Sequence, residues 1–161
     1  MRLNTRGRYA LRMMVAMARR SNGSEAISLG KLSSATMLSR RYLEQVVRGL
    51  KEESLLRAVS GRSGGYMLAR PADEITVGQI VEAAIGPISL VDCVAQPELC
   101  LEADHCECRW FYQQLNDGLR SVLDTLTLED LAQRGRIREG TCDFPLATQG
   151  CPTSDAGRPS P

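Results

Sequence analysis

The chain has 161 residues, of which 43% are apolar, so it can form one packed domain with an appendage and is not a wholly disordered chain. No run of 18 apolar residues occurs, which excludes a membrane-spanning helix. The net charge of +1 hides an asymmetry, because residues 1–70 carry 14 Lys and Arg against 4 Asp and Glu, whereas residues 71–161 carry 6 against 15. The basic half is expected to bind a polyanion, although a solvated basic face without a partner would have the same composition.

The first predicted element is an amphipathic helix over residues 1–20. This segment is basic and lacks acidic residues, as a targeting peptide would, but Arg12 interrupts its apolar stretch. Its apolar residues recur at the spacing of one helix face, at Ala10, Met13, Met14 and Met17. A structural helix is therefore predicted.

Two short helices are predicted next, in a helix-turn-helix arrangement. Ser28 can cap a helix over residues 29–35, and Ser39 can cap one over residues 40–52, because each hydroxyl can accept from an unpaired amide at the helix start. Residues 36–38 would form the tight connection, and the second helix would be the one that reads DNA. The apolar faces are predicted to hold Leu29, Leu32 and Ala35 in the first helix and Leu43, Val46, Val47 and Leu50 in the second.

The other face of the second helix is polar and suits DNA. Arg can pair with guanine through two hydrogen bonds, Gln can pair with adenine, and Glu can accept from cytosine. Residues early on such a helix reach base edges, which favours Arg41, Glu44 and Gln45 as base readers. An ordinary solvated helix face is the alternative. The predicted DNA contacts on this helix are Ser39, Arg40, Arg41, Glu44, Gln45, Arg48 and Lys51, with Arg40, Arg48 and Lys51 on phosphates.

A β-hairpin is predicted directly after this helix, from strands over residues 55–59 and 66–69. The connection, residues 60–65, is rich in glycine and carries Arg62, which would enter the neighbouring minor groove as the tip of a wing. A phosphate-binding loop is a weaker interpretation, because such a loop leads from a strand into a helix. Pro71 ends the hairpin, and a helix over residues 77–84 is expected to pack behind it.

Residues 92–108, hereafter the cysteine segment, carry the pattern of a metal site. Thiolates are soft ligands that select zinc, copper(I) or iron–sulfur clusters. The spacings of six, five and one intervening residues lack the Cys-x2–4-Cys knuckle of structural zinc sites and favour a larger cluster in an open loop. Buried core cysteines are the alternative, which the acidic surroundings disfavour. The segment holds Cys93, Cys100, Cys106 and Cys108, together with His105, the one histidine of the chain.

The final predicted elements are a long helix and a shorter one. Apolar residues at steps of three and four predict a helix that packs along another helix, either in a dimer or within the chain. They are Tyr112, Leu115, Leu119, Val122 and Leu126. Thr127 and Asp130 form a capping box for the following helix, and the tail from about Gly135, with Cys142 and Cys151, is expected to be disordered.

Five stretches of the sequence match the pattern of one known family. They are MRLNTRGRYA at 1–10, SRRYLEQ at 39–45, GGYMLARP at 64–71, EITVG at 74–78 and LTLEDL at 126–131. Over about residues 1–133 the chain thus resembles the winged-helix transcription regulators of the IscR, NsrR and CymR type. Its cysteines lie where the cluster-binding members of that family place theirs.

The resemblance implies a fold, a cofactor and partners. The fold would be mainly α-helical with a small β-hairpin wing: a winged helix-turn-helix domain plus a long C-terminal dimerisation helix. An iron–sulfur cluster, [2Fe–2S] as first expectation and [4Fe–4S] as second, would be held by Cys93, Cys100 and Cys106. A homodimer would read a partly palindromic operator in double-stranded DNA, with Glu44 and Gln45 in the major groove.

Three positions depart from the family pattern. Relatives usually begin the wing with Arg-Gly, whereas this chain has Ser60 and Gly61, so Arg62 is the candidate replacement. The fourth ligand of some relatives is a His that corresponds to Arg109, and in others an acid that corresponds to Arg8. The remaining candidates for the fourth ligand are Cys108, which is favoured, His105 and Glu107, or there is no fourth ligand from the protein.

The predicted organisation is a DNA-binding domain at 1–86, a cluster-binding loop at 87–108, dimerisation and following helices at 109–133, and a tail at 134–161. A regulator that senses through thiol oxidation or zinc is the first alternative, and an iron–sulfur electron-transfer or assembly protein is the second. An enzyme is not expected, because the chain has no Cys-x-x-Cys pair and no Ser/His/Asp set. Six cysteines without a secretory signal favour the reducing cytoplasm.

Overall fold

The computed structural model describes residues 5–21, 25–99 and 105–134. The predictions for Cys100, for the tail after residue 134 and for the two thiols in that tail lie outside these ranges. No helix within them is long and apolar enough to cross a membrane. The helices are α1 (Thr5–Ser21), α2 (Leu29–Thr36), α3 (Arg40–Glu52), α4 (Val77–Ile85), α5 (Asp92–Ala95), α6 (Glu107–Thr125) and α7 (Leu128–Arg134), with 3-10 turns at Ala72–Glu74 and Pro97–Leu99; the strands are β1 (Leu56–Val59) and β2 (Gly65–Leu68).

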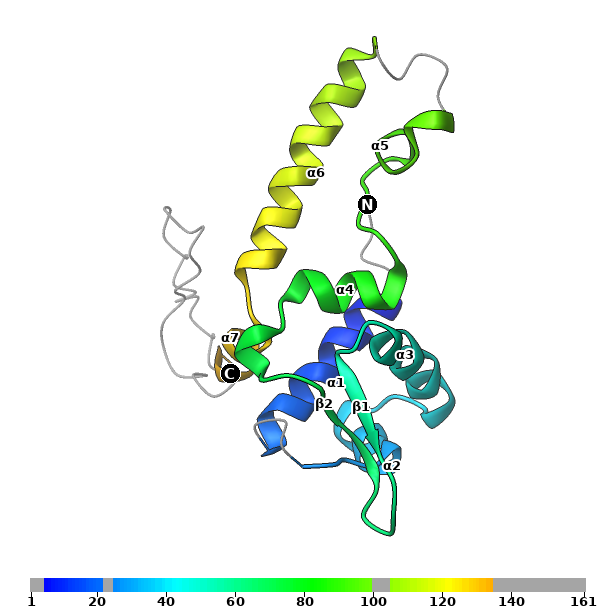
Figure 1. The fold of residues 1–161 in the computed structure, drawn as a ribbon, viewed down its shortest axis with the longest axis vertical. Helices are drawn as coiled ribbons and strands as arrows, with labels where there is room; N and C mark the ends of the chain where they lie inside the picture. Colours follow the sequence, from blue (N-terminus) through cyan, green and yellow to red (C-terminus); the bar gives the residue numbers. More distant parts are fainter. Residues whose placement is uncertain (1–4, 22–24, 100–104, 135–161) are drawn as a thin grey trace, which may run out of the picture.

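The fold is mainly α-helical with one antiparallel hairpin, as the sequence predicts (Figure 1). Helix α1 runs through the centre and packs against α2, α3, α4 and α7. Its predicted apolar face is confirmed, because Ala10, Met13, Met14 and Met17 are all buried. We call α1 to α4, the hairpin and α7 together the body.

Both serine caps of the helix-turn-helix are confirmed. The Ser28 hydroxyl accepts from the amide of Lys31 at 3.4 Å, and the Ser39 hydroxyl accepts from the amide of Tyr42 at 3.3 Å. The predicted face of α2 is wrong at its end, where Ala35 is exposed and Thr36, expected in the connection, is the last residue of the helix. Thr36 can be buried there because its hydroxyl donates to the carbonyl of Leu32 at 2.7 Å.

The hairpin lies one residue from its predicted bounds, with Leu56 opposite Leu68 and Val59 opposite Gly65. A third segment joins it, because Ile27 and Tyr66 exchange two backbone hydrogen bonds of 2.8 and 3.0 Å. A side chain at Gly65 would overlap with the carbonyl of Ile27, so this approach requires glycine. The wing is therefore anchored to the segment around Ile27 that precedes the helix-turn-helix.

Helices α4 and α7 close the body around α1. Each begins with a capping box: Thr76 with Gln79, and Thr127 with Asp130, the second as predicted. The amide of Leu128 donates to the carbonyl of Ile75 at 2.8 Å, which joins the starts of the two helices. Arg19 of α1 donates to the carbonyl of Ala132 at 3.1 Å in the last turn of α7.

Helix α6, which we call the arm, stands away from the body, and α5 lies beside it (Figure 1). The cysteine segment differs from the predicted open loop, because it contains the one-turn helix α5 and a 3-10 turn. The arm also ends one residue before the predicted apolar stripe does, since Leu126 is extended and its carbonyl accepts from the amide of Val77 at 2.8 Å.

Candidate nucleic-acid interface and metal-binding segment

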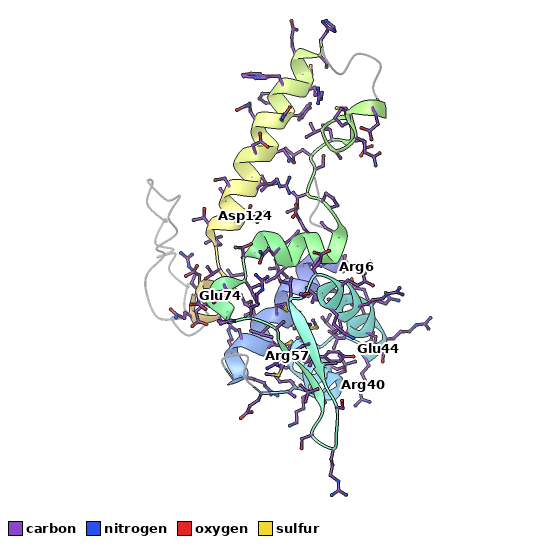
Figure 2. All side chains as sticks on the ribbon, viewed as in Figure 1. Arg6, Arg40, Glu44, Arg57, Glu74 and Asp124 are labelled. Atoms are coloured by element: carbon purple, nitrogen blue, oxygen red, sulfur yellow. The ribbon has the colours of Figure 1, made fainter. Side chains whose placement is uncertain are left out.

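Helix α3 separates its two faces completely. Its apolar side chains, Leu43, Val46, Val47 and Leu50, are buried as predicted. The seven side chains predicted to contact DNA are all exposed: Ser39, Arg40, Arg41, Glu44, Gln45, Arg48 and Lys51. Figure 2 labels Arg40 and Glu44 near the hairpin. The structure thus gathers these residues on one solvent-facing surface that could be laid against a duplex.

The hairpin adds a second basic element. Its turn is closed by the amide of Gly64, which donates to the carbonyl of Gly61 at 2.9 Å, and Gly61 has a positive φ of 111° that favours glycine. Arg62 lies between them and is exposed, as expected for a wing tip. Arg57 on β1 is also exposed and was not singled out from the sequence.

A hollow of about 340 Å³ separates α3 from the wing. Its lining includes Glu44, Arg48, Lys51 and Tyr66. Arg48 is bonded to Glu52 at 3.1 Å, but side chains that are 83% and 63% exposed form only a weak pair. An incoming phosphate can therefore displace Glu52 at little cost.

The start of α1 reaches this surface, which the sequence did not predict. Arg6 donates to the carbonyl of Gln45 at 3.2 Å, and the rings of Tyr9 and Tyr42 meet edge to face at 5.4 Å. Arg8 lies over the ring of Tyr9 at 5.4 Å from its centroid. Arg6 thus contacts α3 directly, and Arg8 lies beside the Tyr9 ring that packs against Tyr42 of α3. The only signal in the sequence was the absence of acidic residues from the first twenty.

The described cysteines lie around the start of the arm. Cys106 is the residue before α6 and is half-buried, and Cys93 on α5 is also half-buried. Arg109 of α6 donates from Nε to the carbonyl of Cys93 at 3.3 Å. This bond ties Cys93 to the first turn of α6, which begins directly after Cys106; the family resemblance nominates both cysteines as ligands. The third, Cys100, is outside the described residues.

The candidates for a fourth ligand are all exposed on the first turn of α6 or just before it. They are Cys108, His105 and Glu107. Residues two apart at a helix start point to different sides, so the side chains of Cys106 and Cys108 are not expected to face each other. Within the described ranges, no three His, Cys, Asp or Glu side chains are gathered closely enough to hold a metal ion.

The arm divides the predicted apolar stripe into two halves. Leu119 and Leu126 of the stripe pack against Val77 and Val81 of α4, so this half is part of the intramolecular core. Leu123, which the stripe did not include, packs there too, and Val122 of the stripe is half-buried. In the other half, Tyr112 and Leu115 are exposed. Two large neighbours that the stripe did not include, Trp110 and Phe111, are 68% and 51% exposed.

Asn116 lies at the boundary between these halves and is 4% exposed. Its side-chain oxygen accepts from the amide of Leu90 at 3.2 Å. Arg120, one turn further along, donates to Glu82 of α4 at 2.7 Å. The arm is thus tied both to the segment that leads to Cys93 and to the body.

Comparison with protein families gives one matching family model, Rrf2, described as an iron-dependent transcriptional regulator, over residues 3–134. The transcriptional regulator CymR of Bacillus subtilis is 36% identical over 132 residues, which cover 82% of this chain and 90% of CymR. The transcriptional regulator IscR of Pectobacterium atrosepticum is 31% identical over 137 residues, covering 85% of this chain and 82% of IscR.

Comparison with solved structures agrees. The structure of CymR, described as the global cysteine regulator of B. subtilis, matches with a TM-score of 0.69 and 35% sequence identity. The match covers 83% of this chain and 98% of CymR. The family resemblance seen in the five sequence motifs is therefore confirmed.

Proposed function

Because the chain belongs to the Rrf2 family of transcriptional regulators and is a regulator rather than an enzyme, we propose that an iron–sulfur cluster controls its affinity for operator DNA. The observation that carries this proposal is the placement of Cys93 and Cys106 against the start of the arm. The arm in turn packs on α4, and α4 packs on α3. Helices α6, α4 and α3 thus form a continuous series of packed elements between the cysteines and the DNA-facing surface.

The DNA-binding domain in this proposal spans residues 1–86. Arg41, Glu44 and Gln45 read base edges, while Arg40, Arg48 and Lys51 bind phosphates next to the Ser39 cap. Arg62 enters the minor groove from the wing. Full exposure of these side chains and the hollow between α3 and the wing support the assignment.

The cluster-binding part, residues 87–108, has the donor chemistry that iron requires. Thiolates are the usual ligands of iron–sulfur clusters, and partial burial of Cys93 and Cys106 would shield the iron from solvent. Cys93, Cys100 and Cys106 would hold the cluster, with Cys108 as fourth ligand and His105 or Glu107 as substitutes. The expected cluster is [2Fe–2S], with [4Fe–4S] as the alternative. When bound, it would supply sensitivity to iron, oxidants or nitric oxide.

The dimerisation part, residues 109–133, contains most of the arm and makes the protein a homodimer. Phe111, Tyr112 and Leu115 form an exposed apolar surface on one helix, which a second copy can bury, and Trp110 is exposed beside it. Two-fold symmetry then presents two α3 helices to a partly palindromic operator, one helical turn or about 34 Å apart. A regulator of DNA with reduced thiols would act in the cytoplasm.

Coupling between cluster and DNA follows from rigid contacts. The close approach of α3 to α4 leaves no space for a side chain at Gly49, which would overlap with the carbonyl of Ala83. Arg120 and Glu82 fix α4 to the arm. A coupling free energy of about 1–3 kcal/mol between the two sites would change operator affinity about 5- to 150-fold.

The test compares one operator fragment bound by cluster-loaded protein and by the Cys93→Ala variant. We expect the affinities to differ at least 5-fold. The Cys151→Ala variant is the control, since it removes a thiol outside the cysteine segment and should behave as the unchanged protein. Equal affinity of cluster-loaded protein and Cys93→Ala would refute cluster sensing.

Anaerobic purification distinguishes the alternatives. A cluster regulator contains iron and sulfide and absorbs visible light, whereas a zinc or thiol-oxidation sensor is colourless and still binds DNA. Colourless, iron-free protein that binds its operator normally would favour a sensor of zinc or of thiol oxidation. A coloured protein without DNA affinity would instead point to electron transfer or cluster assembly.

A further inference from the structure

Arg109 contacts the backbone at both described ends of the cysteine segment. Its side chain donates from Nε to the carbonyl of Cys93 at 3.3 Å, in a partly buried position. Its own amide donates to the carbonyl of Cys106 at 3.1 Å. One residue, the third of α6, therefore bonds to two cysteines that lie 13 positions apart in the sequence.

Among the described residues, the backbone around Cys93 bonds mainly within its own turn. Helix α5 comprises four residues, and a single helical turn is not stable on its own. Its amides bond within the turn, from Val94 to Val91 and from Gln96 to Asp92. Upstream, Asn116 holds the amide of Leu90. The bond from Arg109 is the tie that reaches Cys93 itself.

We infer that Arg109 is a positioning residue that holds Cys93 beside the first turn of α6 before any metal binds. A guanidinium has donors only and cannot ligate a metal, so Arg109 acts through the hydrogen bond that it donates to the Cys93 carbonyl. It orders a ligand in advance, which reduces the loss of conformational freedom when metal binds. We call the hydrogen bond from Arg109 to the Cys93 carbonyl the brace. Its role in metal binding rests on the proposed cluster function, but the bond itself forms in the protein without metal.

The first experiment uses reduced, metal-free protein. Iodoacetamide alkylates cysteines, and mass spectrometry follows Cys93 against exposed Cys108 in the same chain as internal reference. In Arg109→Gln the rate at Cys93 should rise about tenfold relative to Cys108, while Arg109→Lys, which keeps a donor of similar reach, should restore part of the protection. Arg120→Gln is the matched control, because it removes an arginine of the same helix that bonds to Glu82 instead.

Hydrogen exchange distinguishes the effect of losing the Arg109 hydrogen bond from the effect of losing the Cys93 thiol. The amides of Val94 and Gln96 should lose protection in Arg109→Gln and keep it in Cys93→Ser, because that variant retains the backbone carbonyl that Arg109 binds. Unchanged alkylation of Cys93 and unchanged exchange in Arg109→Gln would overturn the inference.

Anaerobic titration with Co²⁺ then tests what the brace is for. Groups that orient metal ligands typically contribute 10- to 100-fold to metal affinity, and we expect Arg109→Gln to weaken Co²⁺ binding by that factor. The thiolate-to-cobalt absorption band should keep its position, since the ligands are the same. A looser Cys93 in a protein that binds neither cobalt nor iron would support the brace and refute the cluster. Equal Co²⁺ affinity of both proteins would refute the role of the brace in metal binding.

Discussion

The body buries most of its apolar side chains against one another, with Met37 and Val59 as exposed exceptions, whereas the arm leaves its largest ones in solvent. Along α1 and α3 one whole face of each helix is inaccessible to water, but in α6 the one buried residue is the polar Asn116. The body therefore has the core of an independently folded unit. The arm is an amphipathic helix whose outer half lacks its complement within the described part of the chain, which is the pattern of an assembly surface.

Matched leucine truncations in the body and the arm should give the largest difference in the free energy of unfolding. Leu50 is fully buried in the body and Leu115 is 47% exposed on the arm. Leu50→Ala should lower the free energy of unfolding by about 2–5 kcal/mol, through lost burial and a residual cavity. Leu115→Ala should lower it less, and mostly in a way that depends on protein concentration. Urea denaturation at two concentrations measures both; equal losses would remove the distinction between the regions.

The aromatic end of the arm should carry the next largest effect. Aromatic residues that become buried in an interface often contribute about 2 kcal/mol or more to binding. We expect Trp110→Ala to raise the dimer dissociation constant about 30-fold, measured by analytical ultracentrifugation. Gln113→Ala is the control, a polar exposed residue of the same helix. A dimer as tight as that of the unchanged protein would place the interface elsewhere.

The local features of the body were readable from the sequence. Ser28, Ser39 and Thr127 each act as the predicted cap, because a cap depends on residues three positions apart. The buried faces of α1 and α3 follow from helical periodicity in the same way. Thr36 was misassigned because a threonine hydroxyl can satisfy itself on its own helix and so tolerate burial.

What the sequence could not give are contacts between distant segments. The bond from Arg6 to Gln45 spans 39 positions and that from Arg109 to Cys93 spans 16. Neither follows from a periodic pattern, since both depend on how whole helices are packed. The same holds for the arm: its apolar stripe was predicted, but only the packing of α4 decides that Leu119 is covered and Leu115 is not.

Two substitutions on α3 test the one polar, exposed face of the body that is proposed to bind DNA. They distinguish base reading from phosphate binding. Gln45→Ala should cost about 1–3 kcal/mol in discrimination at one base pair and leave the salt dependence of binding nearly unchanged. Arg48→Ala should weaken binding to all sequences and reduce the slope of log K against log salt by about one. Filter binding at several salt concentrations distinguishes them. Interchanged behaviour would mean that the two side chains have the opposite roles.

The smallest expected effect concerns α7, where the body is joined to the base of the arm. The amide of Thr127 donates to the carboxylate of Asp130 at 2.9 Å and its hydroxyl at 2.7 Å, and these bonds hold the pKa of Asp130 below its ordinary value of 3.8. A carboxyl whose pKa is lower in the folded state stabilises the protein above its unfolded pKa, and the stabilisation is lost as pH falls through the folded pKa.

Because Asp130 is exposed, this contribution should stay below about 1 kcal/mol. Asp130→Asn should therefore remove a small part of the loss of stability between about pH 4 and pH 2. Urea denaturation across that range measures the difference. An acid profile of Asp130→Asn identical to that of the unchanged protein would show that α7 is held by Leu128 and the contact between Arg19 and Ala132 rather than by its cap.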